Sequence, residues 1–212
     1  MAARFEAQLL SDAELIPEAQ LLSSDEEEPS LEDVLELTLA DEEEADPAYP
    51  SMGFAEAQKA LAQSLDREAV ATTVLRFAVS KFKRALLLSA NRSVVTGWRG
   101  MGQEVSERRM KLLVIPLDVP SSFKLVTDTC SHFIGSIRDA PTETFDRLLG
   151  AGARSTAVMM PLLARGRAVH LLYVDSGPKE FTPPDVGELL ILSQSVTRSY
   201  EALIQKRQRA KP

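Results

Sequence analysis

Two apolar runs joined by a short basic turn constrain the fold of this chain most. The runs cover residues 158–163 and 168–174, and Arg165-Gly166-Arg167 lies between them. Gly166 can adopt a positive φ without steric cost, as a tight hairpin turn requires. Each run is too short to span a membrane and has the composition of a strand buried on both faces. We therefore predict a β-hairpin over residues 156–175, at the centre of a sheet.

The charge of the chain is divided between two regions of opposite sign. Residues 1–52 hold 16 acidic residues and one basic residue, whereas the rest holds 15 acidic and 23 basic residues. Runs of carboxylates and scattered prolines in the first region oppose a packed core. We expect a disordered acidic arm over residues 1–52 and an ordered, mildly basic domain over residues 54–207. The opposed charges leave open whether the arm folds back on the domain.

The arm contains short apolar motifs among its acidic residues. EAQLLSD at 6–12 recurs as EAQLLSSD at 18–25, and LEDVLELTL at 31–39 has apolar residues at helical spacing. Acidic segments of this kind can fold on binding as amphipathic helices. Under this interpretation, another protein contacts Leu9, Leu10, Leu21, Leu22, Leu35 and Leu39. The alternative is that the repeat arose by chance and that the arm only keeps the protein in solution.

Hydrophobic periodicity predicts the order of elements in the domain. A helix over 55–82, broken near 64–66 with Asp66 as a cap, precedes strands at 84–90, 93–102 and 110–117. A helix at 123–133, an extended piece at 133–137 and a short helix at 143–149 follow. The hairpin and a long helix capped by Thr182 complete the chain, and Pro116 and Pro120 indicate either an edge position or a strand end for residues 110–117. The fold class is α+β: an antiparallel five- to six-stranded sheet with helices on its faces.

The residue inventory argues against catalysis and metal binding. Cys130 is the one cysteine, which excludes an internal disulfide, and the two histidines have no helical metal-ligand spacing. Cys130 and His132 are two residues apart and would not face one another on a helix. We therefore expect no catalytic residue, no metal, no cofactor and no enzyme activity.

Location and partner class follow from the same inventory. Neither a signal-peptide pattern nor an 18-residue apolar run occurs, so we expect a cytoplasmic protein without membrane insertion. The basic residues near the C-terminus suit the dipole of a helix end and are too few to indicate nucleic acid as a partner.

The succession of segments over about residues 60–205 resembles a GAF domain. The resemblance is carried by ALLLSANRSVVTGWRGMG, by IPLDVPSSFKLVTDT and, above all, by MMPLLARGRAVHLLYVDSGPKEFTPPDVGELLILSQSVTRSYEALI. GAF domains bind small molecules or partner proteins and regulate other activities. The Asn-Lys…Phe…Asp-Glu pattern of cyclic-nucleotide-binding members is not found. We take Cys130 as a packing residue on a helix rather than a bilin attachment site, and a sulfoxide reductase of this fold needs several cysteines.

The resemblance also implies a ligand cavity between the sheet and the connection after the third strand. The residues that match this region are Trp98, Arg99, Ser121, Ser122, Phe123 and Tyr173. An arginine, serines and aromatic rings would suit a small anionic or aromatic ligand. The alternative is that Trp98 and Tyr173 pack in or beside the core and that Arg99 is a solvated charge.

Two functions are consistent with these patterns. The first is a non-catalytic regulatory protein, whose GAF-like domain contacts another protein while the acidic arm binds a partner. The second is a small-molecule sensor that acts through homodimerisation, with the first and last helices forming a bundle across a two-fold axis.

Overall fold

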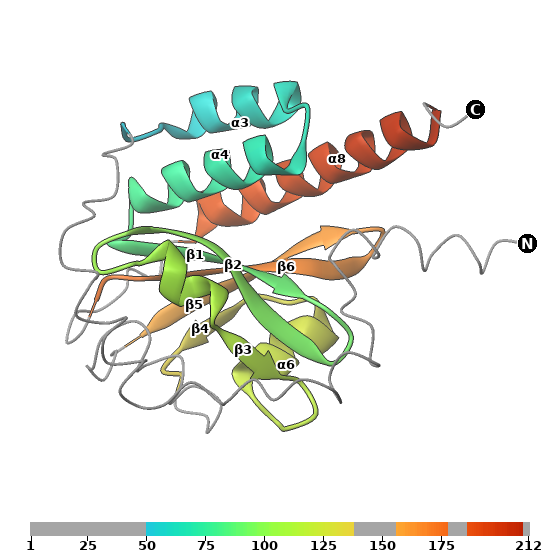
Figure 1. Ribbon diagram of the computed structural model, residues 1–212. Coiled ribbons are helices and arrows are strands. Elements are labelled where there is room, and N and C mark those ends of the chain that lie inside the picture. The colour runs from blue at the N-terminus through green and yellow to red at the C-terminus, as the bar shows by residue number, and fades with distance from the viewer. Residues whose placement is uncertain (1–49, 138–155, 178–185, 210–212) are drawn as a thin grey trace, which may run out of the picture. The chain divides into compact units, whose positions relative to one another are not determined.

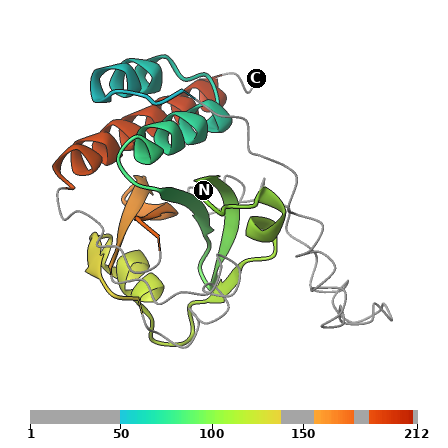
Figure 2. The same cartoon turned by 90° about the vertical axis from the view of Figure 1, so that its left-hand side faces the viewer.

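The computed structural model describes residues 50–137, 156–177 and 186–209, and the account below concerns these residues. They belong to one compact unit of the chain, which begins at Ala45. Two helices cover one face of a curled sheet and carry a third helix on their outer side, and shorter helices lie against the other face (Figures 1 and 2). Residues 1–49 lie outside the described ranges, and so do the predicted helix at 143–149 and the predicted cap Thr182.

The sheet has six strands, and every neighbouring pair is antiparallel. In spatial order the strands are β3 (Val114–Pro116), β2 (Val94–Gly102), β1 (Arg84–Ala90), β6 (Arg167–Asp175), β5 (Ala157–Ala164) and β4 (Phe133–Gly135). This order confirms the predicted α+β fold class and the edge position of the strand that contains Pro116.

The β5–β6 hairpin has the tight turn at Gly166 that the sequence predicted, with two loop residues where the sequence had indicated three. Ala164 pairs with Arg167, and the loop residues Arg165 and Gly166 both have positive φ, 51° and 75°. Positive φ at both loop positions is the geometry that matches the right-handed twist of paired strands. β6 lies beside β1 at the middle of the sheet, so the apolar run of β6 is buried between two neighbours.

The helical layer consists of α3 (Phe54–Gln63), α4 (Arg67–Val79) and α8 (Gly187–Arg209). Asp66 separates α3 from α4, because its Oδ1 accepts a hydrogen bond from the backbone N–H of Ala69 (2.8 Å) and caps α4. Side chains from all three helices form one apolar core with β1, β5 and β6, and Met52 belongs to it. None of the helices in the described ranges is both long and apolar enough to cross a bilayer.

Two short helices, α5 (Glu107–Lys111) and α6 (Ser122–Thr129), pack against the other face of the sheet. The predicted strand at 110–117 was wrong at its start, because Ser106 caps α5 and residues 110 and 111 are helical. The predicted helix at 123–133 was too long: it ends at Cys130, whose φ is 51°. Cys130 is therefore a half-buried helix end and not a residue of the apolar helix face.

The edge of the sheet beyond β5 is only partly covered by β4 in the described residues. β4 pairs with Ala157–Met159, whereas Pro161 pairs with Leu171 of β6 beyond the end of β4. A proline has no N–H, so it fits a ladder only where its nitrogen faces away from the paired strand. The nitrogen of Pro161 therefore points to the side on which β4 has ended.

Candidate functional site

An irregularity in the β1–β2 pairing decides where two of the predicted ligand residues lie. Leu87 pairs with Arg99 and Leu88 pairs with Gly97, so Trp98 is the extra residue of a β-bulge. The bulge turns both Trp98 and Arg99 towards the helical layer. Arg99 Nη1 lies 2.9 Å from Oγ1 of Thr72 on α4, so the guanidinium is tied to this helix and is not a freely solvated charge.

Trp98 belongs to a column of rings between the sheet and α8. Its indole stacks on the His170 ring with centroids 4.5 Å apart, and His170 Nδ1 lies 3.0 Å from the Tyr200 hydroxyl. The Arg67 guanidinium lies 5.6 Å from the centroid of the Trp98 ring. Burial, aided by the Arg67 charge, lowers the pKa of His170 to about 4. Burial also raises the pKa of Tyr200, so both groups are neutral at pH 7 and the phenol can donate to the imidazole.

The other four predicted ligand residues lie on the opposite face of the sheet. Ser121 caps α6, because its Oγ accepts a hydrogen bond from the backbone N–H of Lys124 (3.1 Å). Ser122 is buried, and Phe123 and Tyr173 are both 0% exposed within the apolar cluster beneath α6. The six residues are thus divided between two faces and do not line one cavity. Whether any of them contacts a ligand stays a prediction.

A buried charge network on the α6 face was missed by the sequence reasoning. Arg84 of β1 and Asp175 of β6 are 1% and 0% exposed, and two contacts of 2.7 and 3.0 Å join guanidinium and carboxylate. The Tyr173 hydroxyl (2.5 Å) and the Gly177 N–H (2.7 Å) also donate to Asp175. The only signal in the sequence is that Arg84 opens one apolar run and Asp175 closes another. The network binds the ends of the two central strands together.

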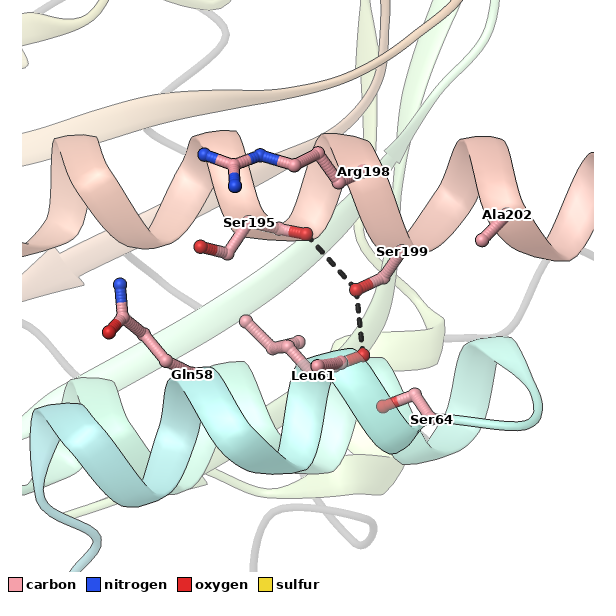
Figure 3. Close-up of a pocket in the computed structure, with 8 residues that line it drawn as sticks. Gln58, Leu61, Ser64, Ser195, Arg198, Ser199 and Ala202 are labelled. Atoms are coloured by element: carbon pink, nitrogen blue, oxygen red, sulfur yellow. Dashed lines mark hydrogen bonds between the residues drawn. The ribbon is translucent and has the colours of Figure 1, made fainter.

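A hollow lies in the helical layer, between α3 and α8 (Figure 3). Its volume is about 450 Å³. Its walls are Gln58, Leu61, Ala62 and Ser64 of α3, and Ser195, Arg198, Ser199 and Ala202 of α8. We call it the α3/α8 groove.

The serine hydroxyls in the walls of the α3/α8 groove donate their hydrogen bonds to backbone carbonyls. Ser199 Oγ donates to the Leu61 carbonyl (2.8 Å) and is also 3.0 Å from the Ser195 carbonyl, so it joins the two walls (Figure 3). Ser64 and Ser195 likewise donate to carbonyls one turn earlier in their own helices. A ligand in the groove could therefore form hydrogen bonds with the Gln58 amide, the Arg198 guanidinium and the lone pairs of the serine hydroxyls.

Comparison with solved structures identifies the fold. A phycocyanobilin-bound GAF domain from a cyanobacterial phytochrome superposes with a TM-score of 0.57 at 11% identity, covering 74% of this chain and 98% of that one. The GAF domain/HD domain protein from Geobacter sulfurreducens gives a TM-score of 0.53 at 12% identity, covering 70% and 98%. The described domain has a GAF-type fold. The sequence itself matches no protein-family model and no curated protein.

Structures similar to this GAF-type domain come from both signalling proteins and an enzyme. Residues 122 to 287 of a methyl-accepting chemotaxis protein give a TM-score of 0.56 at 15% identity, covering 72% of this chain and 98% of that one. The free methionine-R-sulfoxide reductase from Neisseria meningitidis gives a TM-score of 0.50 at 13% identity, covering 72% and 89%. The fold therefore does not by itself decide whether the protein is catalytic.

The GAF-type domain shows no assembled metal or thiol chemistry in the residues that the structure describes. No group of three or more His, Cys, Asp or Glu side chains in those ranges could hold a metal ion. Cys130 is a free thiol whose Sγ lies 3.6 Å from the Thr127 carbonyl and 3.8 Å from the Gly166 carbonyl. These carbonyls are acceptors, and neither is a base that would activate a thiol.

Proposed function

We propose that the chain is a non-catalytic regulatory protein whose GAF-type domain binds another protein, with the acidic arm as a second contact. The observation that carries the proposal is the filling of the α6 face of the sheet by the residues that the structure describes there. Phe123 and Tyr173 are fully buried there. The Asp175 carboxylate accepts hydrogen bonds from Arg84, Tyr173 and Gly177. The hollow lies instead between two surface helices, where a protein segment can reach it.

Exposed apolar side chains beside β3 favour a protein partner. Leu112, Val114 and Val119 are 56%, 54% and 43% exposed; Val114 begins the edge strand β3, and the other two lie before and after it in the sequence. Apolar side chains gathered on a surface are typical of a contact with another protein. Arg108 and Lys111 are exposed just before this strip, so it suits a partner with acidic and apolar side chains.

The second candidate is a small-molecule sensor that acts through homodimerisation. One observation favours its dimer: α3 and the middle of α8 each carry one exposed acid and one exposed base, before the basic last turn of α8. These are Glu56 and Lys59 on α3, and Glu201 and Arg198 on α8. A two-fold contact brings the same surface together twice, so a face with both charges can complement itself.

Native mass spectrometry of the protein purified from its own cell tests the proposal. The full chain is compared with a chain that starts at residue 50, because the Pro50 carbonyl accepts hydrogen bonds from Arg76 and Met52 is buried. We expect a protein partner on the full chain, held more weakly or lost without the arm. A retained small molecule on both chains, with no partner protein, would contradict the proposal and support the sensor.

A further inference from the structure

We propose that an exposed patch on β2 and β3 binds an amphipathic helix of the partner protein, apolar on one side and acidic beside it. The inference rests on the proposed function and deepens it, because it assigns the contact to one surface and to one class of partner segment. It follows from the register of β2 and β3, the exposure of their side chains and the charges at the two ends of the patch.

The register of β2 and β3 places four side chains on one face of the sheet. The pair in the middle, Val95 and Ile115, is 0% exposed and packs in the apolar cluster on the α6 face. Because successive side chains of a strand point to opposite faces, the residues on either side of this pair lie on the helical side of the sheet. These four residues, which we call the β2/β3 patch, are Val94, which pairs with Pro116, and Thr96, which pairs with Val114.

The helices leave the β2/β3 patch exposed. Val114 is 54% exposed and Pro116 is also exposed, whereas Leu87 of β1, which belongs to the core beneath the helices, is 0% exposed. α4 meets β2 farther along the strand, where Thr72 contacts Arg99. In Figure 1, β3 lies low in the view, well away from α3, α4 and α8. The apolar side chains of the patch are therefore accessible to a partner.

Exposed cations lie at both ends of the patch. Arg92 is in the turn just before β2 begins, and Arg108 and Lys111 belong to α5, just before β3 begins. Since the two strands are antiparallel, these positions are at opposite ends of the patch. None of the three cations forms an ion pair with another described residue. Carboxylates of a partner can therefore be attracted to both ends.

The acidic groups near the patch do not offset these cations. Glu107 lies 3.7 Å from Nε of Arg99, so its charge is already opposed. Asp118, which follows β3, is exposed and has no ion pair with a described residue. The surroundings of the patch are thus positive. A two-fold contact between copies would bring this positive surface against itself, so the charges favour a different, acidic partner.

The backbone of β3 favours side-chain contacts over the addition of another strand. The N–H of Leu117 and the carbonyl of Leu113 both form hydrogen bonds with β2. In an antiparallel ladder, the alternate residues Val114 and Pro116 then direct their backbone groups to the free edge. Pro116 has no N–H, so β3 offers an added strand a single donor there. Strand addition depends on a row of main-chain hydrogen bonds, which this short edge does not provide.

The spacing of the patch side chains suits a helix. Side chains paired across the two strands are about 5 Å apart, and those two residues apart along a strand are separated by about 7 Å. Apolar residues three or four positions apart on a helix are separated by about 5–6 Å. Two turns of an amphipathic helix can therefore cover the patch while its carboxylates face Arg92 at one end and Lys111 at the other.

Photo-cross-linking of the full chain, expressed in its own cell, tests the inference. A benzophenone amino acid replaces Ser93, which is exposed beside the patch, and in a control chain it replaces Gln63, which is exposed on α3. Mass spectrometry then identifies the cross-linked peptide. We expect a partner protein joined at position 93 and not at position 63. Its cross-linked segment should carry apolar residues at helical spacing with Asp or Glu beside them.

Variants of charge and of apolar surface test the two parts of the contact. Arg92→Glu with Lys111→Glu should lower the cross-linking yield on the order of tenfold, because two attractions become repulsions. The matched control Lys59→Glu with Lys206→Glu reverses two exposed charges on α3 and α8 and should leave the yield unchanged. Val114→Thr keeps the shape of the side chain and should lower the yield roughly fourfold, because one apolar methyl group is lost. All of these side chains are exposed, so the free energy of unfolding should change little.

Three results would overturn the inference. They are a cross-linked segment without carboxylates, a cross-link at position 93 to a segment of this chain or of a second copy, and a yield that Arg92→Glu with Lys111→Glu leaves intact. In the last case, a partner that native mass spectrometry still finds on the double variant would leave the proposed function standing with its contact elsewhere. The absence of a partner protein from every form of the chain would refute the proposed function and this inference together.

Discussion

Replacing Arg84 by methionine tests how much the buried charge network stabilises the domain. The change removes the two contacts of 2.7 and 3.0 Å to Asp175 and leaves this carboxylate 0% exposed, with the Tyr173 hydroxyl and the Gly177 N–H as donors. Breaking a buried ion pair by removing one partner costs about 3–5 kcal/mol. Since domains are stable by about 5–15 kcal/mol, we expect Arg84→Met to remove about a fifth or more of the free energy of unfolding.

Urea unfolding followed by Trp98 fluorescence measures this loss. The matched control is Arg92→Met, which shortens an exposed arginine in the β1–β2 turn and should change the free energy of unfolding by less than about 0.5 kcal/mol. The double variant Arg84→Met with Asp175→Leu should recover most of the loss, because no buried charge is then unpaired. A loss below about 1 kcal/mol for Arg84→Met would refute the reasoning, and so would a double variant no more stable than the single one.

Three further outcomes are expected from local features of the domain. The unfolded chain takes up a proton on His170 near pH 6.5 and the folded domain does so only near pH 4. The contribution of neutral His170 to the free energy of unfolding is therefore complete above pH 6.5 and falls by up to about 3 kcal/mol as the pH drops to 4. His170→Gln should reduce this pH dependence of the free energy of unfolding, as measured by urea titrations. Gly97→Ala should cost several kcal/mol, on the order of a buried overpacking change, because its Cβ would lie 1.8 Å from the Met110 carbonyl oxygen. Gly53→Ala meets nothing within 4 Å and is the thermal-melting control. Ser121→Ala should cost about 1 kcal/mol in the same assay by removing the cap of α6, and an unchanged melting temperature would contradict that role.

Elements defined by local signals were predictable from the sequence. The Gly166 turn and the Asp66 cap each act within a few residues, so the hairpin and the break between α3 and α4 were predicted correctly. α5 was missed, although Ser106 caps it, because its five residues contain mostly charged side chains and lack an apolar period. The end of α6 at Cys130 was missed because nothing in the sequence indicates that this cysteine has a left-handed backbone conformation.

The arrangement of the candidate site depended on register, which the sequence does not encode locally. Alternation along β2 is interrupted at Trp98, and this one extra residue places Trp98 and Arg99 on the face opposite to Tyr173. The partnership of Arg84 and Asp175 likewise needs β1 to lie beside β6 in a particular register, across 91 positions of sequence. Such pairings come from the packing of the whole sheet.

The position of Pro161 has a consequence for self-association. Beyond the end of β4, the described edge of β5 would offer a foreign strand a row of backbone donors and acceptors, the template on which cross-strand aggregates grow. Pro161 removes a donor from the middle of that row and its ring obstructs the approach of another backbone. A valine at this position would suit the strand equally well and would complete the template. The proline thus makes this edge of β5 a poorer template for a strand of a second copy.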